Sequence, residues 1–130
     1  MTRSVKIPGP DHPITIAPNR HRVVVTAGGE VIADTRAALT LREASYPPVH
    51  YIPRADTNMA FLTRSKTTTH CPYKGEAAYF SITADGTRST DAVWTYEEPH
   101  PAVAQIAGHL AFYPDRVDAI EERRNDGQPA

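Results

Sequence analysis

The sequence predicts a mainly β fold, built from antiparallel sheets with one or two short helices. Twelve prolines are spread along 130 residues, and each would interrupt a long helix because proline lacks the backbone N–H and clashes with the preceding turn. Short runs of β-branched and aromatic residues lie between turn-forming pairs such as Gly28-Gly29 and Asp85-Gly86, which is typical of antiparallel strands. These two observations exclude a helical bundle.

Length and composition predict a single domain. A chain of 130 residues with 40% hydrophobic and 22% charged residues is large enough for one hydrophobic core and has the composition of a globular protein. We expect the core to span about residues 14–118. An irregular N-terminal arm over 1–13 precedes it, and a polar, frayed C-terminal tail over 121–130 follows it.

The first half of the chain is expected to be mostly strand. Residues 14–16 follow the arm, and residues 21–27 and 30–34 flank a glycine pair, which predicts a β-hairpin. Residues 37–42 fit either a strand or one helical turn, and we favour the strand. Residues 46–53 are β-branched and aromatic between prolines, which suits an edge strand or the start of a strand.

The middle of the chain is expected to contain one short helix. Asp56 is placed to cap a helix through residues 59–62, and residues 63–66 would form its exit. Polar residues 67–69 then lead to the next strand, which is predicted over residues 76–83 and ends in the Asp85-Gly86 turn.

The last third of the chain is expected to contribute three elements. Residues 91–96 form a strand. Pro101 suits the first turn of a short helix that carries Val103 and Ile106. Residues 110–113 then form a last core segment before Pro114.

The balance of charges argues against nucleic acid as a partner. Lysine and arginine number 14 against 15 acidic residues, so there is no overall positive field to attract nucleic acid. The basic and aromatic residues between Tyr51 and Lys74 are better explained as a mixed solvated surface than as a nucleic-acid stripe.

Nothing in the sequence resembles a membrane span or a secretory leader, and a lone Cys71 requires no oxidising compartment. We therefore predict a soluble, cytoplasmic protein that binds neither nucleic acid nor membrane. The sequence does not fix the oligomeric state.

Five sequence blocks are distinctive: residues 22–35, 46–53, 69–77, 94–99 and 107–115. They span about residues 20–118, and the Thr-His-Cys-Pro-x-Lys-Gly block is the most specific of them. Together the blocks resemble a bacterial domain-of-unknown-function family, number four-two-seven. The resemblance implies a fold similar to the compact antiparallel arrangement called the β-tent, and it implies no particular activity.

The resemblance does not bring a metal or a cofactor with it. Related β-tent domains bind zinc through paired cysteines, whereas this chain has only Cys71. Its six histidines also show no paired ligand spacing. We therefore expect no metal and no cofactor.

The family is sometimes labelled nucleotidyltransferase-like, and the sequence does not support that activity. Such enzymes bring two or three carboxylates together on magnesium, because the metal bridges the triphosphate and the attacking oxygen. No phosphate loop is present. The candidate aspartates are well separated and include no Asp-x-Asp pair; they are Asp56, Asp85, Asp91, Asp115 and Asp118.

Aromatic and basic residues around the block at 69–77 predict a ligand-binding pocket. Tyrosine and tryptophan rings supply flat apolar walls with polar tips, while cationic side chains bind carboxylate or phosphate groups. We expect a small polar or anionic organic ligand, and the alternative for each aromatic ring, including that of Tyr79, is simple core packing. The predicted ligand-binding residues are Tyr51, Arg54, His70, Cys71, Tyr73, Lys74, Trp94, Tyr96 and Tyr113.

A second hypothesis is an enzyme or redox protein with Cys71 and His70 as candidate catalytic residues. A thiol becomes nucleophilic where cationic groups stabilise its thiolate. Pro72 favours an extended Cys71, which would turn His70 to the opposite face. The base would then be His50, His100 or His109. The competing interpretation is that the cysteine packs as a small apolar residue.

A third hypothesis is a protein-interaction module, in which the edge strand over residues 49–52 pairs with a partner. We favour the binding module over the other two hypotheses, and whether the protein is an enzyme is left open.

Overall fold

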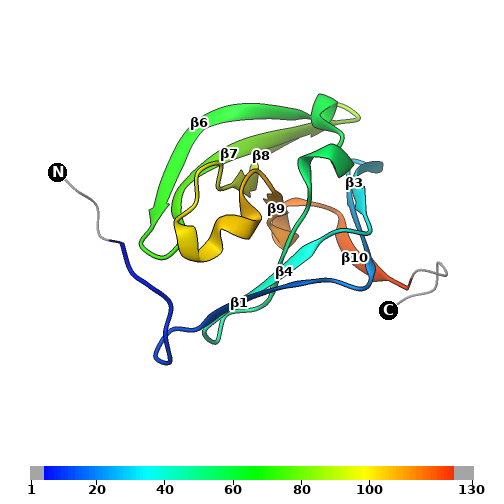
Figure 1. Cartoon of the computed structure of the whole chain (residues 1–130). Helices are drawn as coiled ribbons and strands as arrows, with labels where there is room; N and C mark the ends of the chain where they lie inside the picture. Colours follow the sequence, from blue (N-terminus) through cyan, green and yellow to red (C-terminus); the bar gives the residue numbers. More distant parts are fainter. Residues whose placement is uncertain (1–4, 125–130) are drawn as a thin grey trace.

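The computed structural model describes residues 5–124 and confirms the predicted fold class (Figure 1). In this part of the chain, strands form three antiparallel sheets, and the helices are short 3-10 turns. None of these helices is long and apolar enough to cross a membrane. That the chain forms a single domain stays a prediction.

The first sheet has the order β1-β4-β5. It comprises β1 (Ile14–Pro18), β4 (Leu39–Glu43) and β5 (Val49–Tyr51). β4 and β5 confirm the strands predicted in residues 37–42 and 46–53, and β1 is a strand that was not predicted. Successive side chains of a strand point to opposite faces. Leu41 is accordingly buried, while the adjacent Arg42 is exposed.

The second sheet has the order β10-β2-β3. The predicted hairpin is confirmed as β2 (Arg22–Ala27) and β3 (Glu30–Thr35). The prediction of a frayed tail is wrong for residues 121–123, which belong to β10 (Ala119–Arg123) and pair with β2. β10 forms backbone hydrogen bonds with the edge of β2 that β3 leaves unpaired. Because this pairing depends on the backbone, the polar side chains of residues 121–123 did not indicate it. Residues 125–130 of the predicted tail lie outside the described residues.

The third sheet has the order β6-β7-β8-β9. Its strands are β6 (Leu62–Cys71), β7 (Gly75–Ala84), β8 (Thr87–Thr95) and β9 (Leu110–Phe112). β7 and β8 confirm predicted strands, and β9 forms from the predicted core segment of residues 110–113. Residues 63–69 were predicted to leave a helix and connect to the next strand, and this prediction is wrong. They form most of β6.

The short helix predicted after Asp56 forms as two separate 3-10 turns, η1 (Arg54–Asp56) and η2 (Met59–Phe61). The predicted cap is wrong. The side chain of Asn58 caps η2 by accepting a hydrogen bond from the backbone N–H of Ala60 at 3.2 Å. The Asp56 carboxylate instead accepts a hydrogen bond from the Thr35 hydroxyl, at 2.7 Å.

The helix predicted from Pro101 is confirmed as the 3-10 helix η3 (Pro101–Ile106), which buries Val103 and Ile106. A further short turn, η4 (Pro114–Arg116), follows β9. In Figure 1 the β6–β7 pair lies on one side of the molecule and β1 with β4 on the other, with the yellow segment that carries η3 between them.

Two clusters of buried side chains make up the core. The first contains residues of β2, β3, β7, β8 and β9, among them Val23, Ile32 and Phe80. The second is rich in tyrosine and joins β4, β5, β7 and η3 through Leu41, Tyr79 and other residues. The second cluster leads to the candidate site, because its tyrosines line the surface pocket described next.

Candidate functional site

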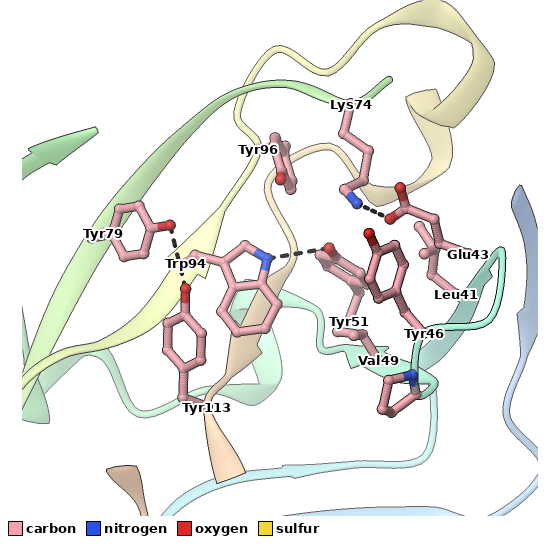
Figure 2. A pocket seen from close by; sticks show the side chains of 11 residues that line it. Leu41, Glu43, Tyr46, Val49, Tyr51, Lys74, Tyr79, Trp94, Tyr96 and Tyr113 are labelled. Carbon is pink, nitrogen blue, oxygen red and sulfur yellow. Dashed lines mark hydrogen bonds and ion pairs between the residues drawn. The ribbon is translucent and has the colours of Figure 1, made fainter. Parts of the chain in front are cut away.

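A pocket of about 210 Å³ opens beside the tyrosine-rich core cluster (Figure 2). We call it the aromatic pocket. Its walls come from segments far apart in the sequence: β4, the β4–β5 loop, β5, the β6–β7 loop, β7, β8 and the residues after β8 and β9. The lining residues are Leu41, Glu43, Tyr46, Pro47, Val49, Tyr51, Lys74, Tyr79, Trp94, Tyr96 and Tyr113.

Trp94 lies at the centre of the aromatic pocket. Its indole N–H donates a hydrogen bond to the Tyr51 hydroxyl, with 3.2 Å between Nε1 and Oη. The two rings are nearly perpendicular, with centroids 6.3 Å apart. The Tyr113 ring packs against the indole at a centroid distance of 4.5 Å. These contacts fix the orientation of the indole.

The tyrosine hydroxyls give the pocket a polar lining. The Tyr79 hydroxyl lies 2.9 Å from the Thr69 hydroxyl and 3.4 Å from that of Tyr113. The Tyr96 hydroxyl makes no hydrogen bond to any residue that the structure describes. It therefore has donor and acceptor capacity left for a ligand.

Burial disfavours the ionised form of three tyrosines of the pocket. It raises the pKa of both Tyr51 and Tyr96 well above the ordinary value of 10. Burial, together with the hydrogen bond to Tyr79, raises the pKa of Tyr113 to about 12. At neutral pH the pocket therefore presents neutral hydroxyls, which can both donate and accept hydrogen bonds.

A partly buried ion pair joins the ammonium of Lys74 to the carboxylate of Glu43 at one side of the pocket (Figure 2). Each side chain is only 12% exposed. The second Glu43 oxygen lies 2.7 Å from Nε2 of His12, whose ring stacks on Tyr73 with centroids 3.9 Å apart. The N-terminal arm therefore contributes to holding Glu43 in place.

The Glu43 carboxylate is ionised at neutral pH. Burial alone would raise its pKa, but hydrogen bonds from Lys74 and His12 outweigh burial and lower the pKa below its ordinary value. The Lys74 ammonium also lies 6.0 Å from the centroid of the Tyr96 ring, close enough for a weak cation–π attraction.

Local backbone structure places Lys74 at the pocket. Gly75 follows it with φ of +110°, a conformation that side chains disfavour and glycine permits. The carbonyl of Lys74 accepts a hydrogen bond from the backbone N–H of His100 at 3.0 Å. The turn before β7 is thereby fixed against the segment that precedes η3.

The structure brings together five of the nine predicted ligand-binding residues. Arg54 and Tyr73 lie outside the pocket. The Arg54 guanidinium packs over the ring of Phe80, 5.5 Å from its centroid, and Tyr73 stacks on His12. The residues that line the pocket as predicted are Tyr51, Lys74, Trp94, Tyr96 and Tyr113.

His70 and Cys71 also lie outside the pocket, and they form no dyad. Nδ1 of His70 lies 2.8 Å from a Glu76 oxygen, and its Nε2 is buried without a hydrogen-bond partner among the described residues. Cys71 is half-buried and packs against the tyrosine-rich cluster.

In the described part of the chain no histidine hydrogen-bonds to the Cys71 thiol. The ring of His50 instead contacts Thr40 and Glu122, and that of His109 contacts a backbone carbonyl. The described residues also contain no group of three or more metal-ligating side chains.

Six of the eleven lining residues were not among the predicted ligand-binding residues: Leu41, Glu43, Tyr46, Pro47, Val49 and Tyr79. A signal for Glu43 was present, because it continues the alternation of Leu39 and Leu41 and so falls on the inward face of β4. A carboxylate on an inward face needs a cationic partner. No comparable pattern singles out Tyr46, which lies in the loop between β4 and β5 and is 65% exposed.

The edge strand predicted for partner binding is already paired within the molecule at one end. The backbone N–H and C=O of Ile52, directly after β5, both bond to Leu110 of β9, each at 2.8 Å. This bridge connects the first sheet to the third.

Comparison with known proteins identifies the family. No curated protein matches the chain. A family model described as a domain of unknown function (DUF427) matches residues 15–123, a range that includes every residue lining the aromatic pocket. The five sequence blocks and this match agree, and the chain belongs to the DUF427 family.

Proposed function

We propose that the protein is a binding module whose aromatic pocket holds a small, planar, polar organic molecule. The observation that carries the proposal is the convergence of five tyrosines, Trp94 and a buried Lys74–Glu43 pair on one concave site. Binding pockets typically combine apolar and aromatic walls with a few fixed polar groups. A planar ligand would pack against the indole and hydrogen-bond to the hydroxyls.

The volume of the pocket limits the ligand's size. Pockets for drug-sized molecules typically enclose about 300–1,000 Å³, whereas this one encloses about 210 Å³. A single six-membered ring with one or two polar substituents is the kind of molecule that suits this space.

The charge balance of the pocket favours a neutral polar ligand over an anion. Lys74 is its one cationic group, and the Glu43 carboxylate compensates that charge. Arg54 and His70, which would have added positive charge, lie elsewhere. An anion would have to compete with Glu43 for Lys74, while a neutral molecule can use the Tyr96 hydroxyl without that competition.

Trp94 provides the test, because it is the only tryptophan in the sequence and lines the pocket. We expect phenol and benzamide to change its fluorescence saturably, and benzoate, the anionic counterpart of benzamide, to bind at least about fivefold more weakly. Tyr96→Phe, which removes a pocket hydroxyl without a hydrogen-bond partner among the described residues, should weaken benzamide binding about tenfold, the value of roughly one good hydrogen bond.

The matched control is Tyr73→Phe, which removes a tyrosine hydroxyl outside the pocket. It should bind benzamide like the wild type. If none of the three probes gives a saturable fluorescence change, the proposed function is wrong.

A further inference from the structure

A second pocket, of about 490 Å³, adjoins the aromatic pocket. We call it the apolar pocket. The two pockets share the walls formed by Tyr46, Pro47, Val49 and Trp94. The remaining lining residues of the apolar pocket are Val25, Pro48, His50, Ile52, Phe112, Pro114 and Ile120.

The apolar pocket offers almost no hydrogen-bonding groups. Its deepest walls are the buried side chains of Val25, Ile52 and Phe112. Of the lining residues that it does not share with the aromatic pocket, His50 is the one with polar side-chain atoms, and both of its ring nitrogens have hydrogen-bond partners. Nδ1 lies 2.9 Å from the Thr40 hydroxyl and Nε2 lies 3.0 Å from a Glu122 oxygen.

Trp94 lies where the polar and apolar surroundings meet. Figure 2 shows its pyrrole nitrogen turned toward Tyr51 in the aromatic pocket and its six-membered ring turned away from that hydrogen bond. The same indole lines both pockets. A molecule packed on it could therefore have a polar end among the tyrosines and an apolar end beyond it.

We propose that the ligand of this protein is amphipathic, with a polar ring in the aromatic pocket and an alkyl chain in the apolar pocket. The inference rests on the proposed function and adds the ligand class. Four residues line both pockets, so the two pockets lie side by side, and this favours one molecule that occupies both.

The rim of the apolar pocket is poorly suited to a peptide strand. Pro47, Pro48 and Pro114 line it, and proline has no backbone N–H with which to pair an added strand. A flexible alkyl chain needs only apolar contact, and that is what Val25, Ile52, Phe112 and Ile120 supply.

The test compares benzamide with 4-butylbenzamide and 4-hexylbenzamide on the 130-residue chain, using Trp94 fluorescence. Each buried methylene strengthens binding about fourfold. We therefore expect 4-hexylbenzamide to bind at least about tenfold more tightly than benzamide, with 4-butylbenzamide in between. This series uses the wild-type protein, so it does not depend on a variant folding.

The variant Ile120→Phe tests whether the alkyl chain of the ligand lies in the apolar pocket. The larger side chain fills part of the apolar pocket, so the gain from the alkyl chain should fall by at least about fivefold while benzamide binds as before. The control, Ile120→Leu, keeps the volume and should retain the gain.

Equal affinities for benzamide and 4-hexylbenzamide would overturn the inference and leave the proposed function standing. If no member of the series binds, the proposed function fails, and the inference fails with it. Sedimentation gives a further check: a wild-type dimer that Ile120→Phe converts to a monomer would mean that a second copy covers the apolar pocket, and this too would overturn the inference.

Discussion

Glu43 links the aromatic pocket to the N-terminal arm. One carboxylate oxygen contacts Lys74, and the other contacts His12, a residue of that arm. Strand alternation in β4 predicts that Glu43 faces inward, yet it cannot name the partners, because each of them lies 31 residues away in the sequence. Only folding brings Glu43, Lys74 and His12 together. A site that depends on contacts between such distant residues could therefore be predicted only in part from the sequence.

Replacing Glu43 tests the energetic role of this contact. Glu43→Gln keeps the shape of the side chain but leaves the Lys74 ammonium largely buried without its counter-charge. Hydrogen bonds to charged groups contribute about 1.5–3 kcal/mol, so we expect a loss of about 2 kcal/mol in the free energy of unfolding, measured with urea at neutral pH. The exposed control Glu30→Gln should change that free energy by less than about 0.5 kcal/mol.

The same variant should also change the pH dependence of stability. Folding lowers the pKa of Glu43, so its contribution is present above the ordinary value of 4.5 and is lost as pH falls through the lowered pKa. The wild type should therefore lose more stability than Glu43→Gln between about pH 5 and pH 3. Parallel acid profiles for the two proteins would contradict this expectation.

Tyr113 should have the opposite pH dependence. Folding raises its pKa from 10 to about 12, so its contribution is complete below pH 10 and is lost as pH rises toward about 12. We expect Tyr113→Phe to show a smaller loss of stability than the wild type between about pH 9 and pH 11.5. The tyrosinate absorbance of the folded proteins should support this: at about pH 11 the variant should show nearly the same absorbance as the wild type, because Tyr113 is still protonated there.

At the scale of the elements, β6 shows why polar strands are hard to predict. It is an edge strand of the third sheet, and most of its side chains are exposed, with Leu62, Ser65, His70 and Cys71 only partly buried. Prediction of strands from sequence relies on alternating apolar residues, and this strand has few. This segment is a strand because its backbone forms hydrogen bonds with β7. By contrast, the hairpin of β2 and β3 was predictable because its turn and its apolar strands are adjacent in the sequence.

The turn of that hairpin offers a matched pair of substitutions. A Cβ atom added at Gly28 would lie 2.6 Å from the carbonyl oxygen of Ala84, whereas one added at Gly29 would have no atom within 4 Å. Both glycines have positive φ. We therefore expect Gly28→Ala to cost about 3 kcal/mol through clash and strain, and Gly29→Ala about 1 kcal/mol through strain alone. Urea unfolding of the two variants measures the difference, and equal losses would mean that the close approach to β7 has no energetic effect.

At the scale of the whole molecule, the sequence predicted the strands far better than their arrangement. The resemblance to the family implied an antiparallel fold, and the strand-rich pattern agreed with it. Neither indicated that β10 would complete the second sheet or that the first sheet would join the third. Such pairings depend on contacts between distant segments, for which local periodicity has no signal. The aromatic pocket could not be predicted for the same reason. β4, β5, β8 and the β6–β7 turn meet there only after the sheets have assembled.

The bridge between Ile52 and Leu110 should report whether the sheets form one cooperative unit. Both residues are at most 1% exposed, and their backbones exchange two hydrogen bonds of 2.8 Å. We expect their amides to exchange hydrogen only through global unfolding, with a free energy equal to that from urea unfolding and the same dependence on urea. The amide of Lys6, in the arm, bonds to the carbonyl of Pro72 and should exchange through local opening, with little dependence on urea. Urea-independent exchange at Ile52 and Leu110 would mean that the first and third sheets separate without unfolding. The aromatic pocket, whose walls come from both of these sheets, would then open with them rather than being held in a fixed shape.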